Sequence, residues 1–326
     1  MTNIVALGAG RMGRGIAQVF AYAGHDVTVL DFKPRSPEEA AKLLAAGKQE
    51  VAQNLAFLVD LNVLDAGEVD AILDRIKGAS ADQAEAVLGA ADYVFEGVPE
   101  VMSAKEDALA RAGKLTRPDC IIASTTSTMS VNALSKFVER PERFLNAHWL
   151  NPAYLIPLVE VSPGDGTKEE VVTQLTDFLK SVGKVPVRCK ASPGYIVPRI
   201  QAAAMNEAAR MVEEGVATAE DIDTAVRVGF GLRYATMGLV EFIDWGGVDI
   251  LYYACNYLQQ ELQADRYAPA QIVNQKMASG ELGLSHGKGF YDYSEVDPDK
   301  FRAEKLSTFV ALLRHMDMLP QLKRSQ

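Results

Sequence analysis

The sequence predicts an α/β protein, in which a doubly wound parallel sheet with an inserted helical hairpin precedes an all-helical C-terminal domain. Three observations carry this prediction. Short apolar runs alternate with helical periodicity up to about residue 190, a glycine-rich turn joins the first run to a helix, and runs of strand length are nearly absent afterwards. We therefore expect two domains, 1–190 and 191–326, with the Ser-Pro-Gly of residues 192–194 marking the change.

The composition is ordinary for a soluble globular protein. The 326 residues are 48% hydrophobic and 23% charged, and the net charge of -10 argues against nucleic acid and anionic membrane as partners. No apolar run reaches the roughly 18 residues of a membrane span, and no signal-like segment opens the chain. Cys120, Cys189 and Cys255 lack metal-ligand spacing and predict reduced thiols, so we expect a cytoplasmic protein without a metal site.

The first element is an apolar strand at residues 4–7, which runs into a turn that contains Gly8, Gly10 and Gly13 before a helix. The first glycine permits a tight turn, the second lets the backbone approach a pyrophosphate, and the third lets the helix pack closely. The N-terminus of that helix then points at the phosphates. We assign Gly8, Gly10, Met12 and Gly13 to a bound dinucleotide.

The second apolar strand, residues 27–30, ends in Asp31, about 20 residues beyond the turn. An acid there accepts hydrogen bonds from the adenosine ribose hydroxyls and repels a 2′-phosphate. This favours NAD over NADP, although Lys33 and Arg35 work against that preference. Strand, glycine turn, helix and acid together predict a Rossmann-type NAD-binding domain.

A departure from a minimal doubly wound domain follows. Residues 37–61 and 66–76 both show amphipathic helical spacing, with a short break between them, and predict a projecting helical hairpin. Its charges are mostly acidic. Coenzyme A brings several phosphates that prefer a basic surface, so the hairpin argues against a coenzyme A substrate.

The next buried strand, residues 93–98, ends at Val98, and Glu100 and Lys105 follow its carboxyl end. In an open α/β sheet this end faces the ligand crevice. We assign Val98, Glu100 and Lys105 to the cofactor's nicotinamide ribose or the substrate. An ordinary ion pair on a helix surface is the alternative for Glu100 and Lys105.

Another strand, residues 121–124, runs into the hydroxyl-rich loop 125–128 at the same edge. One of these hydroxyls could bond a substrate oxygen, or they could merely cap the helix that starts near Ser130.

A histidine and an acid then follow on two short strands. His148 sits at the carboxyl end of an apolar run, and Glu160 lies within the next apolar run, 158–161. A buried acid is costly unless it is paired, and the imidazole is the cheapest local partner. The pair is either a proton acceptor with its orienting carboxylate, or a core histidine beside an unrelated acid.

Several motifs together resemble the L-3-hydroxyacyl-CoA dehydrogenase superfamily over nearly the whole chain. Besides the glycine turn they are ASTTSTMS (123–130), HWLNP (148–152), PLVEV (157–161), SPGYIVPR (192–199), GKGFYDY (287–293), and EGVPE (96–100) with Lys105. The resemblance implies that His148 is the general base, Glu160 its orienting partner, Ser127 the hydroxyl that binds the substrate oxygen, and Asn151 a supporting residue. It also implies NAD-dependent oxidation of an L-3-hydroxyl to a ketone.

The C-terminal half predicts helices and a partner copy. Helical spacing covers 195–214, a stretch starting with Thr218 and Asp221, and then 251–262, 269–278 and 298–313. The apolar surface of these helices is larger than one small domain can bury, so we expect a homodimer through this region, as in the family.

Departures from the family pattern bear on the substrate. Pro198 stands where the family usually has an Asn that assists the substrate oxygen, which leaves that role empty or filled by another residue. The loop after His148 is closer to members that act on free acids, such as gulonate and carnitine dehydrogenases. Arg233 is shared with those members and suits a carboxylate, although an inter-domain salt bridge is its alternative.

We therefore expect a small free 3-hydroxy carboxylate as substrate. The first alternative is a short-chain L-3-hydroxyacyl-CoA such as 3-hydroxybutyryl-CoA, because the GKGFYDY and GVDI segments resemble enzymes with that substrate. The second is a non-catalytic NAD-binding protein with a structural role.

Overall fold

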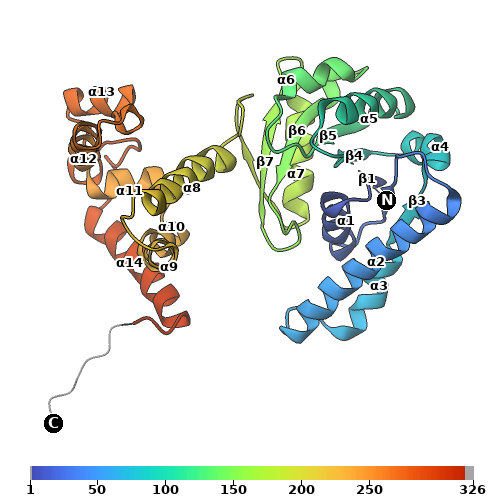
Figure 1. Cartoon of the computed structure of the whole chain (residues 1–326), viewed down its shortest axis with the longest axis horizontal. Coiled ribbons are helices and arrows are strands. Elements are labelled where there is room, and N and C mark those ends of the chain that lie inside the picture. Colours follow the sequence, from blue (N-terminus) through green and yellow to red (C-terminus); the bar gives the residue numbers. More distant parts are fainter. Residues whose placement is uncertain (1, 320–326) are drawn as a thin grey trace, which may run out of the picture. The chain divides into compact units, whose positions relative to one another are not determined.

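The structure is a computed structural model that describes residues 2–319. The chain divides into two compact units, the first ending at Met205 and the second beginning at Asn206 (Figure 1). None of the helices within residues 2–319 is long and apolar enough to cross a membrane.

The first unit is built on one eight-stranded sheet, counted over the described residues, with strand order β3-β2-β1-β4-β5-β6-β7-β8. The strands are β1 (Ile4–Leu7), β2 (Val27–Leu30), β3 (Ile76–Ala79), β4 (Tyr93–Glu96), β5 (Ile121–Ser124), β6 (Phe144–Trp149), β7 (Leu158–Pro163) and β8 (Val185–Arg188). All neighbouring pairs are parallel except β6 and β7. The order reverses at β1, which lies between β2 and β4, and such a reversal opens a ligand crevice.

Helices cover both faces of this sheet. Successive strand residues point to opposite faces, so Ala6 and Phe95 join one buried cluster while Leu7 and Val94 join another. Helices α1, α2, α3 and α7 pack on the first cluster, and α4, α5 and α6 on the second. Their bounds are α1 (Arg11–Tyr22), α2 (Pro37–Asp60), α3 (Val69–Asp74), α4 (Ala84–Gly89), α5 (Met102–Leu115), α6 (Val131–Leu134) and α7 (Glu169–Ser181).

The inserted hairpin is formed by α2 and α3, which lie side by side in Figure 1. A capping box between Ser36 and Glu39, with Pro37 in the first turn, starts α2 where the sequence predicts it. The second helix is shorter than predicted, because Ile76–Ala79 forms the edge strand β3 beside β2. Ile76 and Ala79 are buried on the sheet, and Gly78 disfavours a continued helix. The hairpin packs against α1 and the edge strand β3 through buried residues such as Leu55.

The second unit is helical throughout its described residues, apart from isolated bridges near Lys288. Its helices are α9 (Ala219–Ala225), α10 (Leu232–Thr236), α11 (Leu239–Gly246), α12 (Val248–Glu261), α13 (Gln271–Ser279) and α14 (Pro298–His315). Buried Asp244 accepts hydrogen bonds from the backbone N–H groups of Phe290 and Tyr291 and so anchors the GKGFYDY segment. The predicted fold class, a Rossmann-type sheet followed by a helical domain, is confirmed.

The two compact units divide within α8 (Val197–Glu213), while the domain boundary predicted at residue 190 stays a prediction. Hydrogen bonds tie residues 195–197 to the first unit. The backbone N–H groups of Ile196 and Val197 bind the carboxylate of Glu160, and the hydroxyl of Tyr195 binds the carbonyl of Thr126. The segment that leaves the sheet is therefore still fastened to it.

Candidate active site

A cavity of about 610 Å³ opens at the carboxyl ends of the strands on both sides of the reversal. Its walls come from the residues that follow β1, β2, β4 and β5 and from the end of β6. They include Gly8, Gly10, Met12, Asp31, Val98, Glu100, Thr125, Ser127, His148 and Trp149. Residues far apart in the sequence are thus gathered into one pocket within the first unit, at the edge where an open α/β sheet binds its ligand.

The glycine turn has the geometry that a pyrophosphate needs. Gly8 has a φ of +107°, and a Cβ there would lie 3.0 Å from the carbonyl oxygen of Gly97. A Cβ on Gly13 would lie 1.9 Å from the carbonyl oxygen of Gly8, so only glycine lets α1 pack this closely. At Gly10 an added Cβ would meet no described atom within 4 Å, which leaves room for a ligand. The first turn of α1 contains no acidic residue and no capping side chain among the described residues, so its N–H groups suit an anion.

Asp31 is buried at the rim of the same cavity, just beyond β2. Its Oδ2 accepts a hydrogen bond of 2.7 Å from Nε of Arg35, and its Oδ1 accepts one of 3.5 Å from the backbone of Lys33. The guanidinium of Arg35 is therefore turned towards this carboxylate, whereas Lys33 meets it through its backbone N–H. The Asp31 carboxylate, which would repel a 2′-phosphate, and the Arg35 guanidinium, which would attract one, therefore lie in contact at the cavity rim.

The His148 and Glu160 side chains meet across two antiparallel strands. They are directly paired in the β6–β7 register, so both project from the same face. Nδ1 of His148 lies 2.8 Å from Oε2 of Glu160, and the two residues are 5% and 0% exposed. The second carboxylate oxygen accepts from the backbone N–H groups of Ile196 at 2.9 Å and Val197 at 2.8 Å. A carboxylate so fixed holds the proton on Nδ1 and leaves the Nε2 lone pair as the acceptor.

The loop after β5 is held by Glu100. Oε1 of Glu100 accepts hydrogen bonds from the backbone N–H groups of Ser127 (3.0 Å) and Thr128 (3.2 Å), and from the hydroxyls of Thr126, Ser127 and Thr128. Partial burial alone would raise the pKa of Glu100. The hydrogen bond from Thr126, the charge of Lys105 and the bonds from Thr128 outweigh it and lower that pKa, which keeps the carboxylate ionised.

Lys105 does not line this cavity. Its side chain is only 1% exposed, and Nζ lies 3.0 Å from Oε1 of Glu96 and 3.3 Å from Oε2 of Glu100. Glu96 is the last residue of β4 and is fully buried, and it also accepts from the Val98 backbone and the Ser124 hydroxyl. The ammonium is therefore enclosed between two carboxylates.

The remaining predicted residues lie outside the cavity wall. Asn151 is exposed, and its side chain makes no hydrogen bond with residues 2–319. Arg233 belongs to the second unit, where it is exposed, with Nε 3.3 Å from the carbonyl of Gly229 and the guanidinium 4.9 Å from the centre of the Phe242 ring. No carboxylate in the described chain forms an ion pair with Arg233.

Tyr195 and Asn146 were not predicted from the sequence. The ring of Tyr195 stacks on that of His148, and its hydroxyl bonds both Asn146 and Thr126. Asn146 has one available clue, since it precedes His148 by two residues in a strand and so shares its face. Tyr195 has a weaker one, its place directly after the Ser-Pro-Gly of residues 192–194.

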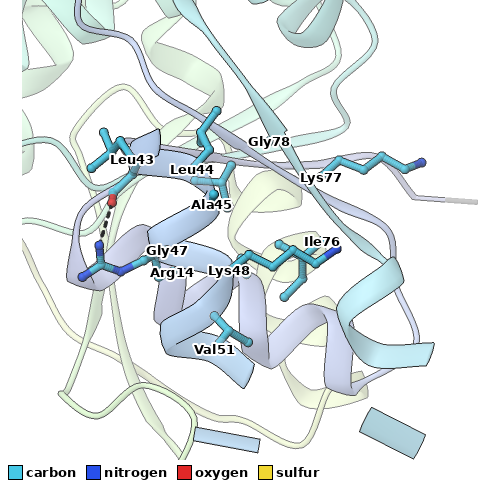
Figure 2. Close-up of a pocket in the computed structure, with 13 residues that line it drawn as sticks. Arg14, Leu43, Leu44, Ala45, Gly47, Lys48, Val51, Ile76, Lys77 and Gly78 are labelled. Carbon is cyan, nitrogen blue, oxygen red and sulfur yellow. Dashed lines mark hydrogen bonds between the residues drawn. The ribbon is translucent and has the colours of Figure 1, made fainter. Parts of the chain in front are cut away.

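A second cavity of about 240 Å³ lies between α1, α2 and β3 (Figure 2). Apolar side chains such as Leu43, Leu44 and Val51 line it, and Arg14 donates a hydrogen bond of 3.2 Å to the carbonyl of Ala9, the dashed line in Figure 2. It contains no imidazole or carboxylate. Of the two cavities, the larger one therefore holds the candidate chemistry.

A Rossmann-type sheet whose crevice presents a carboxylate-fixed imidazole beside a hydroxyl-rich loop is the arrangement expected of an NAD-dependent dehydrogenase. The chain belongs to the 3-hydroxyacyl-CoA dehydrogenase family. The model of that family's NAD-binding domain matches residues 3–192, and the model of its C-terminal domain matches residues 194–293. Membership confirms the predicted NAD cofactor and makes the protein an oxidoreductase rather than a non-catalytic NAD-binding protein.

Relatives with different named substrates resemble the chain. The 5-formyl-3-hydroxy-2-methylpyridine 4-carboxylate 5-dehydrogenase of Mesorhizobium japonicum is 32% identical over 316 residues, which cover 97% of this chain and 98% of that protein. A probable 3-hydroxybutyryl-CoA dehydrogenase of Deinococcus radiodurans is 35% identical over 288 residues, covering 88% and 98%. The solved structure of a 3-hydroxyacyl-CoA dehydrogenase from Archaeoglobus fulgidus has a TM-score of 0.77 at 30% identity and covers 98% and 100%.

Proposed function

We propose that the protein oxidises the 3-hydroxyl of a small free hydroxy carboxylate, with His148 as the proton acceptor. The observation that carries the catalytic part is the His148–Glu160 pair. It is buried, the carboxylate fixes Nδ1, and the imidazole lines the same cavity as the glycine turn. A purely structural role gives no reason to bury this pair at a ligand crevice.

The residues of the chain divide the work between them. NAD, when bound, supplies the acceptor for the hydride that leaves the carbinol carbon. Nε2 of His148 takes the hydroxyl proton, and Glu160 stabilises the imidazolium that results. Ser127 donates a hydrogen bond to the substrate oxygen in place of the 3.4 Å bond that its hydroxyl makes to Glu100, and Glu100 still fixes the backbone that carries Ser127. Asn151 is proposed only as a supporting residue near the imidazole.

The residues of the cavity wall support the proposed cofactor contacts. Gly8, Gly10 and Met12 border the pyrophosphate, Asp31 binds the adenosine ribose, and Val98 and Glu100 border the nicotinamide ribose. Gly13 acts through close packing of α1. Lys105 acts through Glu100, which its ammonium holds at 3.3 Å.

Substituting the base tests the catalytic part. His148→Ala should lower kcat by about 10²-fold to 10⁴-fold, the usual contribution of a general base, while NAD binding measured by fluorescence stays unchanged. His286, exposed in the second unit, is the matched control, and His286→Ala should leave kcat unchanged. Turnover that survives His148→Ala would overturn the assignment.

The preference for a free acid rests on two observations. The Mesorhizobium relative is named for a pyridine carboxylate and matches nearly the whole chain. Arg233 offers a guanidinium that is not engaged by any carboxylate in the described chain, and guanidinium groups bind carboxylates in bidentate fashion. The Deinococcus relative and the Archaeoglobus structure favour the second candidate, a short-chain 3-hydroxyacyl-CoA.

Screening for NAD reduction with 3-hydroxybutyryl-CoA, gulonate, carnitine and aromatic hydroxy acids separates the two candidates. For a free acid, Arg233→Met should lower kcat/KM by about tenfold to a hundredfold, mainly through KM, because a charge-assisted hydrogen bond is lost. Arg227→Met, an exposed arginine nearby in sequence, is the matched control. A best substrate that is a thioester, with Arg233→Met unimpaired, would contradict the free-acid proposal.

We also propose a homodimer that forms through the second unit. Ile250, Tyr253 and Tyr257 are each at least 60% exposed and follow the i, i+3, i+7 spacing of one face of α12. Tyr253→Glu combined with Tyr257→Glu should give a monomer in light scattering, whereas Tyr22→Glu in the first unit should not. The cytoplasmic location stays a proposal, supported by three cysteines that form no disulfide.

A further inference from the structure

We infer that Tyr195 is a positioning residue that ties the proton acceptor to the substrate-binding hydroxyl, so that one side chain sets the spacing between His148 and Ser127. The inference rests on the proposed roles of those two residues. It assigns to Tyr195 a function in turnover beyond filling space.

The ring of Tyr195 makes the contact with the base. The tyrosine is 5% exposed, and its ring lies nearly parallel to the His148 imidazole, with 5.1 Å between centroids and 9° between planes. The carboxylate of Glu160 holds the imidazole by one edge, and Tyr195 covers one of its faces. Rotation of the imidazole about its side-chain bonds is thereby restricted from two directions.

The backbone of Tyr195 serves the same pair. Its φ is 45°, a left-handed conformation that is uncommon for a residue other than glycine and costs free energy. The next two backbone N–H groups, of Ile196 and Val197, both reach Oε1 of Glu160. The unusual backbone thus accompanies a second set of contacts with the catalytic pair.

The hydroxyl of Tyr195 reaches the other part of the site. It donates a hydrogen bond of 2.9 Å to the carbonyl of Thr126 and accepts one of 2.9 Å from Nδ2 of Asn146. The same Nδ2 donates to the carbonyl of Met129 at 3.0 Å. Thr126 and Met129 flank Ser127, so the tyrosine and the asparagine hold its loop on both sides. Burial raises the pKa of Tyr195, which keeps the phenol protonated and able to donate.

Glu100 supplies the opposite anchor of the same loop, through the N–H groups of Ser127 and Thr128. That anchor makes no hydrogen bond or ion pair with His148 in the described chain. Tyr195, in contrast, touches both the base and the loop. Small errors in the spacing of reacting groups cost large factors in rate, so the connection affects turnover.

Tyr195→Phe tests the inference, because it keeps the ring and removes only the hydroxyl. We expect kcat to fall by about tenfold, since two buried partners lose their hydrogen bond and the loop shifts, while NAD affinity changes little and the unfolding temperature falls by only a few °C. Tyr93→Phe is the matched control. Tyr93 is also a buried tyrosine of the first unit, whose ring stacks on Phe178, and its variant should keep full turnover.

A double-mutant cycle separates positioning from general stability. If the hydroxyl acts through Ser127, Tyr195→Phe should change kcat by less than about twofold in a Ser127→Ala background. Equal losses in both backgrounds would overturn the inference, and so would full activity of Tyr195→Phe.

The proposed function fails separately. If His148→Ala keeps its turnover, both proposals fall. If His148→Ala is inactive while Tyr195→Phe is fully active, only the role of Tyr195 falls.

Discussion

Two buried acids of the first unit have similar surroundings, but only one of them is paired with a basic group that lines the ligand cavity. Glu96 ends β4 and Glu160 lies in β7, and both are 0% exposed. Each is paired with a basic side chain, Glu96 with Lys105 at 3.0 Å and Glu160 with His148 at 2.8 Å. Each also accepts further hydrogen bonds, Glu96 from Val98 and Ser124, Glu160 from two backbone N–H groups.

The two pairs differ in whether the basic side chain can contact a ligand in the cavity. Lys105 is 1% exposed and is enclosed by Glu96, Glu100 and a backbone carbonyl, whereas His148 lines the 610 Å³ cavity with one ring nitrogen available. A buried and paired acid is therefore not enough to identify a catalytic residue. A pair can act on a ligand only if one of its groups opens onto the ligand's space.

The enclosed pair still serves the cavity. Glu96 fixes the backbone of Val98, which lines the ligand space, and the hydroxyl of Ser124, whose neighbour Thr125 lines it too. Breaking such a pair leaves an uncompensated buried charge, which is far more destabilising than never having had the pair. We therefore expect the two acids to fail differently when they are substituted.

The largest expected effect is on turnover. Glu160→Gln should lower kcat by about 10²-fold to 10⁴-fold, because the amide no longer stabilises the imidazolium or fixes its tautomer. The unfolding temperature should fall only modestly, since the amide can still accept hydrogen bonds. Steady-state kinetics and calorimetry measure the two, with Glu169→Gln as an exposed, arginine-paired control. If Glu160→Gln lost stability but kept its kcat, Glu160 would have a structural role like that of Glu96, and the catalytic role would be contradicted.

The second effect is on stability. Lys105→Met should lower the free energy of unfolding by roughly 3 to 5 kcal/mol, because Glu96 keeps a buried charge without its cation. Adding Glu96→Gln should restore part of that loss. Denaturant titration measures both variants. If Lys105→Met instead abolishes NAD binding at unchanged stability, the lysine contacts the cofactor directly, as its place in the sequence suggests.

A third pair, Asp31 with Arg35, lies between these extremes, because Asp31 is buried while Arg35 is one-third exposed at the cavity rim. Asp31→Ser should remove the ribose acceptor and release the guanidinium for a 2′-phosphate. We expect kcat/KM to fall about tenfold for NAD and to rise about tenfold for NADP.

The double variant Asp31→Ser/Arg35→Ser controls for the guanidinium. It should lose the gain for NADP and keep the loss for NAD. An equal gain without Arg35 would show that removing the negative charge is sufficient.

The sequence predicts those parts of the site that depend on local pattern. The glycine turn and Asp31 after the second strand follow from strand ends and spacing, while the roles of His148 and Glu160 follow only once the family resemblance is added. The structure places Gly8, Gly10, Asp31 and His148 around one cavity, with Glu160 paired to His148 across the β6–β7 register. The edge strand β3 was not predicted because it has only four residues, one of them Gly78. A strand this short shows no clear alternation of apolar and polar residues after the preceding helix.

Side-chain direction is what spacing alone does not give. Lys105 and Glu100 are both close to the end of β4, yet only Glu100 lines the cavity. The ammonium of Lys105 binds Glu96 in the interior, and the sequence alone does not indicate whether the lysine pairs with Glu96 or with a ligand. Tyr195 depends on a positive φ and on two contacts distant in sequence, and neither leaves a periodic pattern.

Lys184 completes the comparison, as a buried ammonium with no carboxylate partner in the described chain. Its Nζ donates to the carbonyls of Ala153 and Ile156 in the loop that follows HWLNP. Burial lowers the pKa of Lys184 to about 8, against about 10.4 for a free lysine. Below pH 8 both the folded and unfolded states carry the proton, and the cost of burying the charge is present in full.

Between about pH 8 and pH 10.4 the folded state has released this proton and the unfolded state still binds it. Lys184 therefore makes stability rise with pH across that window, and the neutral amine keeps two donors for its two carbonyls. The difference in unfolding temperature between the native protein and Lys184→Met should shift by a few °C in favour of the native protein from pH 7.5 to pH 10, on the order expected for a pKa change of this size. The exposed Lys190→Met serves as control and should show no such trend. A difference that stays constant with pH would mean that the folded state keeps Lys184 protonated, and that its two carbonyls compensate the charge as fully as Glu96 does for Lys105.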